Sequence, residues 1–438
     1  MHPDNPYRDN PPDFAQLAAE FSSLRPFVKD NANGPTIDFK DAAALRTLTT
    51  CLLKKDFALD VVIPEDRLCP TLANRLDYLH HLLDIHAYLD DMSPTPLRVL
   101  DIGTGACAIY AILLARIHIS ATIIATELDN VSYQSALETV RKNDLLSRIT
   151  LYKAPSESSP LLDAIATESD PPFTFTLCNP PFYESAAEME ELTSLKALPS
   201  HAAPTAAVNE LMTPGGEVSF IGRMISESTC TRNRCLWYTS LIGKASSIPP
   251  LVDALKSQNI DNYLLLGMRQ ARTVRWIIGW SFTDIRLPDS MIRPPGFPST
   301  ARYLPPPNTW TYRPLERTGK ILHISDIHDI VEAALRSARV DIESDEDARS
   351  VRVVAPRAIT WTRAARRKGP GESSAEPLFR ARINVATPEA SRRAQSPSVE
   401  TNHDSVISLD WIRGRDRNLV DGFWAFLVRK IGDAVRAT

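Results

Sequence analysis

The stretch FTFTLCNPPFYES, residues 173–185, combines an amide, two prolines and an aromatic ring directly after a run of β-favouring residues. Proline has no backbone N–H and cannot continue a sheet, so Pro180 and Pro181 end the strand in a rigid corner. The side-chain oxygen of Asn179 and the carbonyl oxygen of Pro180 are fixed acceptors that can take both hydrogens of a planar amine. Phe182 offers a ring face on which a base or another planar amide can stack. We therefore expect chemistry at an amine nitrogen, governed mainly by positioning and electrostatics.

A second informative group lies in VLDIGTGACAIY, where Asp101, Gly103 and Gly105 stand at an expected strand-to-helix turn. Glycines at such a turn let the backbone approach a ligand closely. The next expected strand ends in Glu127, where an acid would hold the hydroxyl pair of a ribose. The pattern is D-x-G-x-G rather than the full dinucleotide fingerprint, and no GK[ST] follows, so a P-loop is excluded. These features predict a nucleoside-bearing cofactor, and the Asn-Pro-Pro-Phe corner favours S-adenosyl-L-methionine over NAD.

Strands that alternate with helices must position both groups. From Leu97 onward, short buried-strand patterns alternate with helical ones, which is typical of βαβ units and a parallel sheet. The carboxyl ends of such strands lie along one edge, beside the crevice where ligands bind. The expected strands span residues 97–103, 121–128, 148–154, 173–179, 215–225 and 235–244, with two more strands joined by a basic turn over 262–282.

The chain is expected to divide into four parts. Residues 1–95 have mostly helical periodicity and 96–283 form the alternating domain. The proline-rich residues 284–318 are expected to be a linker. Residues 319–438 are expected to form a small α+β domain, with a polar insert at 387–405 that is expected to be disordered. Its expected strands span residues 320–325, 351–356, 358–363, 379–386 and 406–414, and its expected helices 326–340 and 419–435.

Composition excludes several classes of protein. The net charge of -4 gives no global attraction to nucleic acid, so RNA binding would need a local basic patch. The six cysteines form no C-x-x-C pair and indicate reduced residues of an intracellular protein. The N-terminal stretch is polar and proline-rich, unlike a secretory signal, and no apolar run is long enough to span a membrane.

The histidines give no indication of a metal site. His80, His81 and His86 lie on one expected helix, and His323 and His328 lie at an expected strand–helix junction. No cysteine or acid is seen to complete a site with them, so we expect them to be structural or surface residues. We therefore expect no metal.

The blocks LDIGTGACAIY, ATELDN and CNPPFY together resemble the METTL16-like family of RNA adenine-N6 methyltransferases, which act on U6 small nuclear RNA or ribosomal RNA. The resemblance covers roughly residues 10–283 and includes PPDFAQLAAEF, IPEDRLCPTLANRLDYLHHLLD and QARTVRWIIGWSF. It implies a Rossmann-like class I methyltransferase fold, an α/β architecture whose parallel sheet carries an antiparallel edge hairpin, with a helical N-terminal extension. It also implies a nuclear or cytoplasmic protein, with the nucleus favoured.

The resemblance also assigns roles to residues. It implies that S-adenosyl-L-methionine lies on the glycine turn and on Glu127, with Arg75 at its carboxylate end and Arg67 in support. It implies that Asn179 and Phe182 hold the adenine, and that Asn179 and Asp101 also belong to the cofactor site. Arg272 and Arg275, on the expected basic turn, are plausible contacts to phosphates of a structured RNA. Basic residues in TRAARRK, FRARI and SRRAQ suggest that the C-terminal domain also binds RNA.

Two other functions remain open at this point. A protein glutamine-N5 methyltransferase would use the same pair of acceptors, because a side-chain amide resembles the amine of adenine. A non-catalytic RNA-binding adaptor would keep the fold and the cofactor pocket without the reaction.

Overall fold

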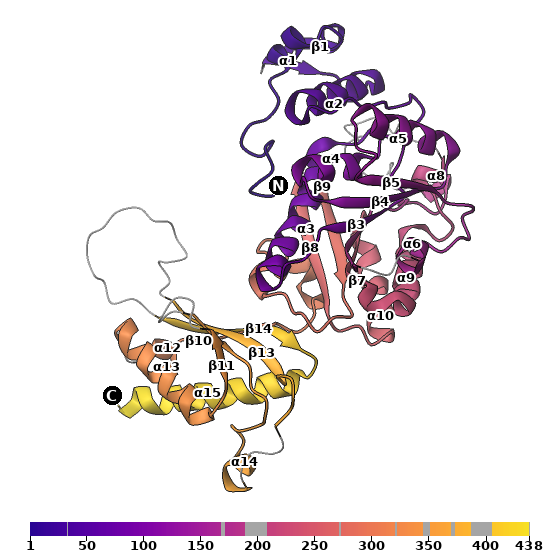
Figure 1. Cartoon of the computed structure of the whole chain (residues 1–438). Coiled ribbons are helices and arrows are strands. Elements are labelled where there is room, and N and C mark those ends of the chain that lie inside the picture. The colour runs from indigo at the N-terminus through magenta and orange to yellow at the C-terminus, as the bar shows by residue number, and fades with distance from the viewer. Residues whose placement is uncertain are drawn as a thin grey trace. The chain divides into compact units, whose positions relative to one another are not determined.

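The computed structural model describes residues 1–32, 34–167, 171–188, 208–270, 273–319, 322–344, 351–368, 373–386 and 405–437. The chain forms two compact units (Figure 1). The first comprises Met1–Thr283 and Pro295–Pro305, and the second Asp284–Pro294 and Pro306–Thr438. Within the described ranges, a search for helices long and apolar enough to cross a bilayer finds none.

A seven-stranded sheet in the order β5-β4-β3-β6-β7-β9-β8 is the centre of the first unit. The strand β3 pairs in parallel with β4 on one side and β6 on the other, so the chain runs outward from β3 in both directions. Strands β7, β9 and β8 are joined antiparallel at one edge. The expected parallel sheet with an antiparallel edge hairpin is thus confirmed. The strands are β3 (Arg98–Ile102), β4 (Thr122–Glu127), β5 (Ile149–Lys153), β6 (Phe173–Cys178), β7 (Cys235–Ile242), β8 (Tyr263–Gln270) and β9 (Thr273–Trp280).

Helices cover both faces of this sheet, because alternate residues of each buried strand point to opposite faces. On one face, Leu100 and Ile102 belong to a core that also contains Met224 of α9 and Leu251 of α10. On the other, α3 packs against α4, and the hydroxyl of its Tyr78 bonds that of a β7 residue. The helices of the sheet are α3 (Leu72–Met92), α4 (Ile109–Ile117), α5 (Asn130–Lys142), α6 (Asp163–Thr167), α8 (Val208–Leu211), α9 (Gly216–Thr231) and α10 (Ile248–Ser257).

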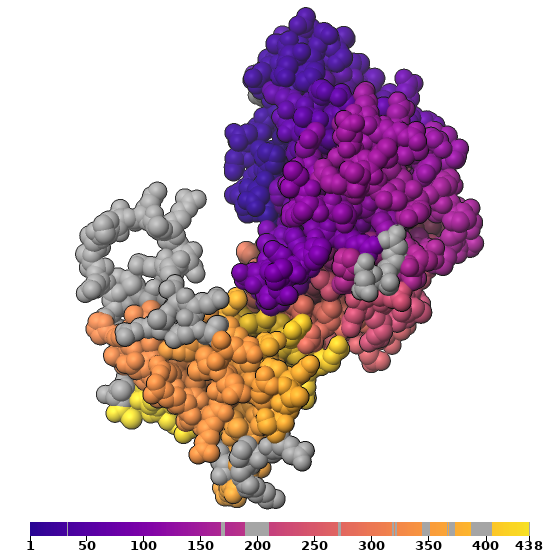
Figure 2. Space-filling model, viewed as in Figure 1, coloured from indigo at the N-terminus to yellow at the C-terminus, as the bar shows by residue number. Residues whose placement is uncertain are grey.

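The N-terminal residues of this unit form helices at the expected places, together with a short hairpin and irregular segments. The residues before α3, indigo in Figure 2, lie at the surface of the unit in that view. Their elements are α1 (Phe14–Glu20), the 3-10 turn η1 (Arg25–Phe27), β1 (Val28–Asn31), β2 (Gly34–Ile37) and α2 (Ala42–Phe57).

One strand expected in this domain is wrong. Residues 216–225 form the first part of helix α9, which begins at Gly216 with Gly215 as its N-cap, both at positive φ. The buried residues Ile221, Met224 and Ile225 recur at helical spacing and face the core. The apolar run satisfies both periodicities over so short a stretch, and only its packing decides between them.

The second unit contains a five-stranded antiparallel sheet in the order β10-β14-β13-β12-β11, with α13 and α15 packed on it. Its core joins Phe379, Trp411 and Phe423 to residues of α13. The elements are α11 (Asp289–Ile292), β10 (Thr309–Tyr312), α12 (Pro314–Thr318), α13 (Ile324–Ala338), β11 (Ile342–Ser344), β12 (Val351–Val354), α14 (Arg363–Lys368), β13 (Phe379–Ala386), β14 (Val406–Gly414) and α15 (Arg417–Ala437); the 3-10 turns η2 (Arg232–Arg234), η3 (Ala245–Ser247) and η4 (Pro298–Tyr303) belong to the first unit.

Three expectations for this part of the chain are wrong. The stretch 284–318 is not a free linker, because β10 pairs with β14 and 295–305 belongs to the first unit. Residues 358–363 form no strand. A strand is also expected at 320–325, but the described residues there form none, and helix α13 begins at Ile324. Isolated apolar residues near bends imitate the strand pattern over such short windows. The insert at 387–405 lies almost wholly outside the described residues.

Candidate active site

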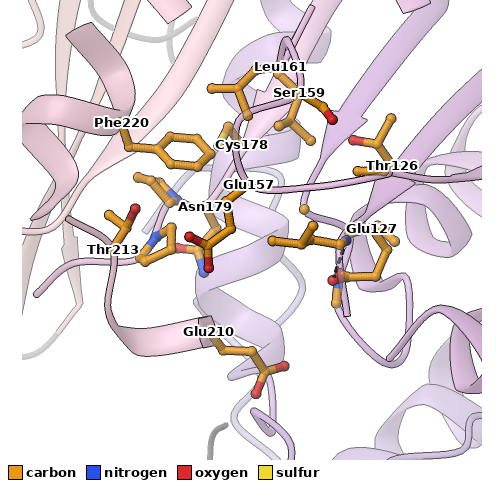
Figure 3. Close-up of a pocket in the computed structure, with 18 of the residues that line it drawn as sticks. Thr126, Glu127, Glu157, Ser159, Leu161, Cys178, Asn179, Glu210, Thr213 and Phe220 are labelled. Carbon is orange, nitrogen blue, oxygen red and sulfur yellow. Dashed lines mark hydrogen bonds between the residues drawn. The ribbon is translucent and has the colours of Figure 1, made fainter. Parts of the chain in front are cut away.

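A cavity of about 670 Å³ opens at the carboxyl ends of β3, β4 and β6, a size typical of small-molecule and cofactor sites. The sheet register explains why chemically informative residues meet here. Ile102 pairs with Thr126 of β4 and with Cys178 of β6, so all three strands end at the same level. Figure 3 shows Asn179 and Phe220 on one side of the cavity and Thr126 and Glu127 on the other. Of the residues expected from the sequence, the cavity is lined by Arg75, Gly103, Gly105, Glu127, Asn179 and Pro180.

The glycine turn and Glu127 are joined by hydrogen bonds. Gly103 and Gly105 have φ values of +66° and +72°, which only glycine adopts without strain. The Gly105 N–H donates to Glu127 Oε2 at 2.8 Å, and the N–H groups of Leu128 and Asp129 donate to Oε1, each at 2.8 Å. Burial raises the pKa of Glu127, while these backbone donors lower it. Glu127 thus fixes the turn and also presents carboxylate oxygens to the cavity.

Arg75 reaches the cavity from α3. Its Nη1 donates to the Tyr110 hydroxyl at 2.9 Å, and its guanidinium lies over the Tyr110 ring at 5.3 Å from the centroid. Its Nε is buried without a hydrogen-bond partner among the described residues. A partly buried guanidinium with spare donor capacity suits the carboxylate end of a ligand.

Asp101 lies beneath the turn rather than on the cavity wall. Its Oδ2 accepts from the Thr104 hydroxyl at 2.6 Å, and its Oδ1 has no partner among the described residues. Burial raises the pKa of this carboxyl to about 7. The donor set therefore fits S-adenosyl-L-methionine: acidic oxygens and open glycine backbone suit the nucleoside and amino groups, and Arg75 suits the carboxylate.

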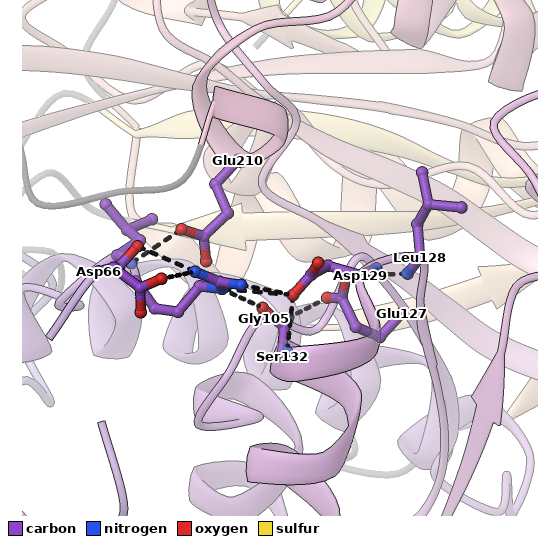
Figure 4. Close-up of polar contacts among 9 residues, drawn as sticks. Asp66, Gly105, Glu127, Leu128, Asp129, Ser132 and Glu210 are labelled. Atoms are coloured by element: carbon purple, nitrogen blue, oxygen red, sulfur yellow. Dashed lines mark hydrogen bonds and ion pairs between the residues drawn. The ribbon is translucent and has the colours of Figure 1, made fainter. Parts of the chain in front are cut away.

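Arg67 does not line the cavity; it contacts residues next to Glu127. Figure 4 shows Asp129 and Ser132, its partners, close to Glu127. Arg67 Nη2 donates to Asp129 Oδ2 at 2.9 Å and its Nε to the Ser132 hydroxyl at 3.0 Å. The same carboxylate of Asp129 accepts from the Ser132 N–H at 2.8 Å and so caps α5. Next to it, the Leu68 N–H donates to the carboxylate of Glu210, a cavity residue. Arg67 thus fixes the start of α5, whose N-cap Asp129 lies two residues after the end of β4.

Phe182 lies just beyond the cavity lining, in a tightly packed position. A Cβ added at Gly243 would come within 2.6 Å of Phe182 Cδ1, so the ring rests directly on this glycine. On α9, Glu217 is fully buried and accepts from the Gly243 N–H at 2.6 Å, the Lys244 N–H at 2.9 Å and the Ser247 hydroxyl at 2.6 Å. Burial raises the pKa of Glu217, opposed by these three donors. This carboxylate fixes the surface against which Phe182 packs.

Arg275 lies under the same ring. Its guanidinium carbon is 5.5 Å from the Phe182 centroid and its Nη1 donates to the Gly243 carbonyl at 3.1 Å. Burial lowers the pKa of Arg275, and the charge of Glu217 opposes that change. Arg275 therefore packs with Phe182 and Gly243, outside the cavity lining. Arg272 lies outside the described residues.

Sequence reasoning missed Glu217, Gly243 and Tyr110. Glu217 lay in a stretch assigned to a strand, and its contact with Gly243 joins segments far apart in the chain. The only local signal for the pair is the glycine that follows β7. Tyr110 was visible in the glycine-turn block, but its contact with Arg75 depends on how α3 packs on α4.

Comparison with known proteins agrees with this geometry. A family model described as RNA methyltransferase matches residues 1–284. The RNA N(6)-adenosine-methyltransferase METTL16 of Mus musculus is 37% identical over 287 residues, covering 65% of this chain and 52% of that protein. The U6 small nuclear RNA (adenine-(43)-N(6))-methyltransferase of Schizosaccharomyces pombe is 32% identical over 409 residues, covering 93% of this chain and 98% of that protein. The chain spans about half the length of the mouse and Xenopus laevis relatives it matches, 52% of each.

Solved structures give the same picture. The hMettl16 catalytic domain in complex with MAT2A 3′UTR hairpin 1 aligns with a TM-score of 0.59 and 36% identity, covering 65% of this chain and 96% of that chain. The N-terminal domain of human METTL16 in complex with SAH aligns with a TM-score of 0.55 and 36% identity, covering 65% of this chain and 99% of that chain. With a family model matched over residues 1–284 and a glycine turn and Asn-Pro-Pro-Phe corner at one sheet edge, the chain belongs to the RNA methyltransferase family.

Proposed function

We propose that this protein transfers a methyl group from S-adenosyl-L-methionine to N6 of an adenosine in a structured RNA such as U6 small nuclear RNA. The observation that carries the proposal is the position of Asn179 and Pro180 on the cavity wall, at the level of the glycine turn, in a chain of the RNA methyltransferase family. The Schizosaccharomyces pombe relative, named for adenine-N6 methylation of U6 small nuclear RNA, supports the choice of RNA. The hairpin and SAH complexes of the METTL16 structures support the substrate class and the cofactor.

The chemistry follows from fixed acceptors. S-adenosyl-L-methionine supplies an electrophilic methyl group that needs no metal or strong acid to activate it. The Asn179 side-chain oxygen and the Pro180 carbonyl oxygen accept the two N6 hydrogens and aim the nitrogen lone pair at the methyl carbon. They also stabilise the positive charge that develops on N6 as the N6–methyl bond forms and the methyl–sulfur bond breaks. The sulfur leaves as a neutral thioether, and one N6 proton is then lost to solvent. Phe182 stacks on the adenine, which must leave its neighbours in the RNA to reach the cavity.

Other residues bind the two substrates in this proposal. Gly103, Gly105 and Glu127 hold the nucleoside of the cofactor, with Asp101 behind them, and Arg75 holds its carboxylate. Arg272 and Arg275 contact RNA phosphates at the rim. The basic residues of the C-terminal unit add affinity for RNA, although Arg380 is partly neutralised by Glu343, with an Nε–Oε2 distance of 2.7 Å.

A nuclear location follows for the proposed substrate, because the relative that covers most of this chain is named for a small nuclear RNA. Imaging the full chain in cells tests this. Exclusion from the nucleus would contradict U6 small nuclear RNA as the target and leave other structured RNAs.

One experiment separates the three candidate functions. The full chain is incubated with labelled S-adenosyl-L-methionine and either total RNA or RNA-depleted protein, and the methylated unit is identified after digestion. The expected result is label in N6-methyladenosine that Asn179→Ala abolishes. Label in protein glutamine alone refutes the proposal. No label in either fraction, with RNA binding intact, identifies an adaptor.

A further inference from the structure

His2, His81 and Asp84 form a compact cluster outside the cavity, where the N-terminal segment packs against α3. One candidate ligand atom from each residue lies within 4.8 Å of the other two. The expectation that no acid completes a site with the α3 histidines is therefore wrong. Asp84 follows His81 by one helical turn, and the N-terminal segment adds an imidazole that sequence spacing does not reveal.

The position of His2 is fixed by the packing of the N-terminal segment. His2 is only 6% exposed, and its backbone N–H donates to Asp77 Oδ1 at 2.9 Å. The Asn5 amide donates to the same oxygen at 2.6 Å and to the Ala73 carbonyl at 2.9 Å. The imidazole is therefore held in place before any ligand arrives, which lowers the entropic cost of binding one.

Ring geometry selects His81 as the partner of His2. The two rings are perpendicular, at 84°, with centroids 4.9 Å apart. Two imidazoles bound to one zinc ion at about 2.0–2.1 Å, at a near-tetrahedral angle, place their centroids about 5 Å apart. His2 and His80 are instead stacked at 11°, so their in-plane lone pairs run parallel and do not meet at one ion, although Asp4 lies near both.

Asp84, the third candidate ligand, already contacts His2. His2 Nε2 lies 2.9 Å from Asp84 Oδ2. A small movement of the two side chains apart lets a metal ion take the place of the proton that they share.

We propose that His2, His81 and Asp84 bind one divalent transition-metal ion, best matched by Zn²⁺, with water as the fourth ligand. The site fastens the N-terminal segment to α3. The Met1 amine donates to the Arg269 carbonyl at 3.0 Å, so the fastened segment contacts β8 near its end. The inference is independent of methyl transfer.

The test uses the full chain without a histidine tag, metal-free and then titrated with ZnCl₂ or CoCl₂. We expect one ion per chain, a rise in the thermal midpoint with Zn²⁺, and a Co²⁺ spectrum of nitrogen and oxygen ligands without thiolate bands. Asp84→Asn and His81→Asn should each weaken binding by more than the roughly 10- to 100-fold that loss of an outer partner costs. Asp84 is exposed, so its variant should fold normally.

Matched controls are Asp91→Asn on the same helix and His323→Asn in the second unit, both at exposed positions. These should bind like the parent chain, as should Cys230→Ser, which removes the exposed thiol. Equal binding by the parent chain, Asp84→Asn and His81→Asn overturns the proposal. So does the absence of any Zn²⁺-dependent rise in the thermal midpoint of the parent chain.

Discussion

Replacing Glu217 by glutamine tests whether its buried carboxylate positions Gly243 and the Phe182 ring that packs on it. Glutamine has the same shape, but one carboxylate oxygen becomes an NH₂ donor. Glu217 Oε2 accepts from the Gly243 N–H, and Oε1 accepts from the Lys244 N–H and the Ser247 hydroxyl. In either orientation of the amide, at least one of the two backbone N–H groups then faces another donor.

The size of the effect follows from these contacts. A hydrogen bond to a charged group contributes about 1.5–3 kcal/mol, and a buried N–H left without an acceptor costs about 1–3 kcal/mol. Because Glu217 is fully buried, we expect the free energy of unfolding to fall by about 2–4 kcal/mol. Whichever N–H faces the NH₂ group, the backbone at 243–244 must move away from the amide, and the Phe182 ring rests directly on Gly243. A displacement of about 1 Å at a reacting group can lower the rate about 100-fold.

The assay compares kcat, KM for RNA and cofactor affinity. We expect Glu217→Gln to lower kcat by roughly 10- to 100-fold. Cofactor affinity should stay unchanged, because Glu217 does not line the cavity. The control is Ile225→Ala, which removes a core side chain on the same helix at a cost of about 2–5 kcal/mol. A wild-type kcat in Glu217→Gln, or the same loss in Ile225→Ala, would refute the positioning role.

Other perturbations follow from the site. Burial raises the pKa of Asp101 in the folded protein to about 7, above its value in the unfolded chain. The contribution of Asp101 to the free energy of unfolding is therefore greatest at low pH and is lost as the pH rises to 7. Relative to Asp101→Asn, the free energy of unfolding of the parent chain should fall by about 1.4 kcal/mol per pH unit from pH 5 to 7 and then level off. Parallel urea titrations of the two proteins across this range measure the fall. Identical pH profiles for the two would contradict the prediction. Gly105→Ala should cost about 1–2 kcal/mol of stability through its positive φ. Calorimetry should also show a loss of cofactor affinity, because the added methyl group enters the cavity; unchanged affinity would count against the turn as the binding site. Arg67→Ala leaves Asp129 without its cation and should lower the free energy of unfolding by about 2–4 kcal/mol, as seen in denaturant melts, with Arg67→Lys between the two.

Much of the fold and the site could be predicted because their signals are local. The alternation of strand and helix patterns identifies the parallel sheet, and the D-x-G-x-G turn and the acid after the next strand recur at fixed distances along the chain. Asn179 could be placed beside the turn because parallel strands end at one edge, and the register of Ile102 with Cys178 agrees.

Prediction was weakest where the local pattern is ambiguous. Residues 215–225 satisfy both strand and helix periodicity, so the sequence alone did not place Glu217 on α9. The stretch 284–318 has the composition of a linker, yet β10 completes a sheet through pairing with β14, about a hundred residues away. Pairing over such separations leaves no local trace.

The sequence by itself therefore determined the reaction corner and the cofactor turn, since these depend on residue types within a few positions of one another. Only the tertiary structure decided what holds and surrounds them. Glu217 meets Gly243, Arg67 meets Asp129, and His2 meets an α3 histidine through contacts between distant segments. The physical reason is that buried polar groups must find partners wherever packing brings them, and packing belongs to the whole chain.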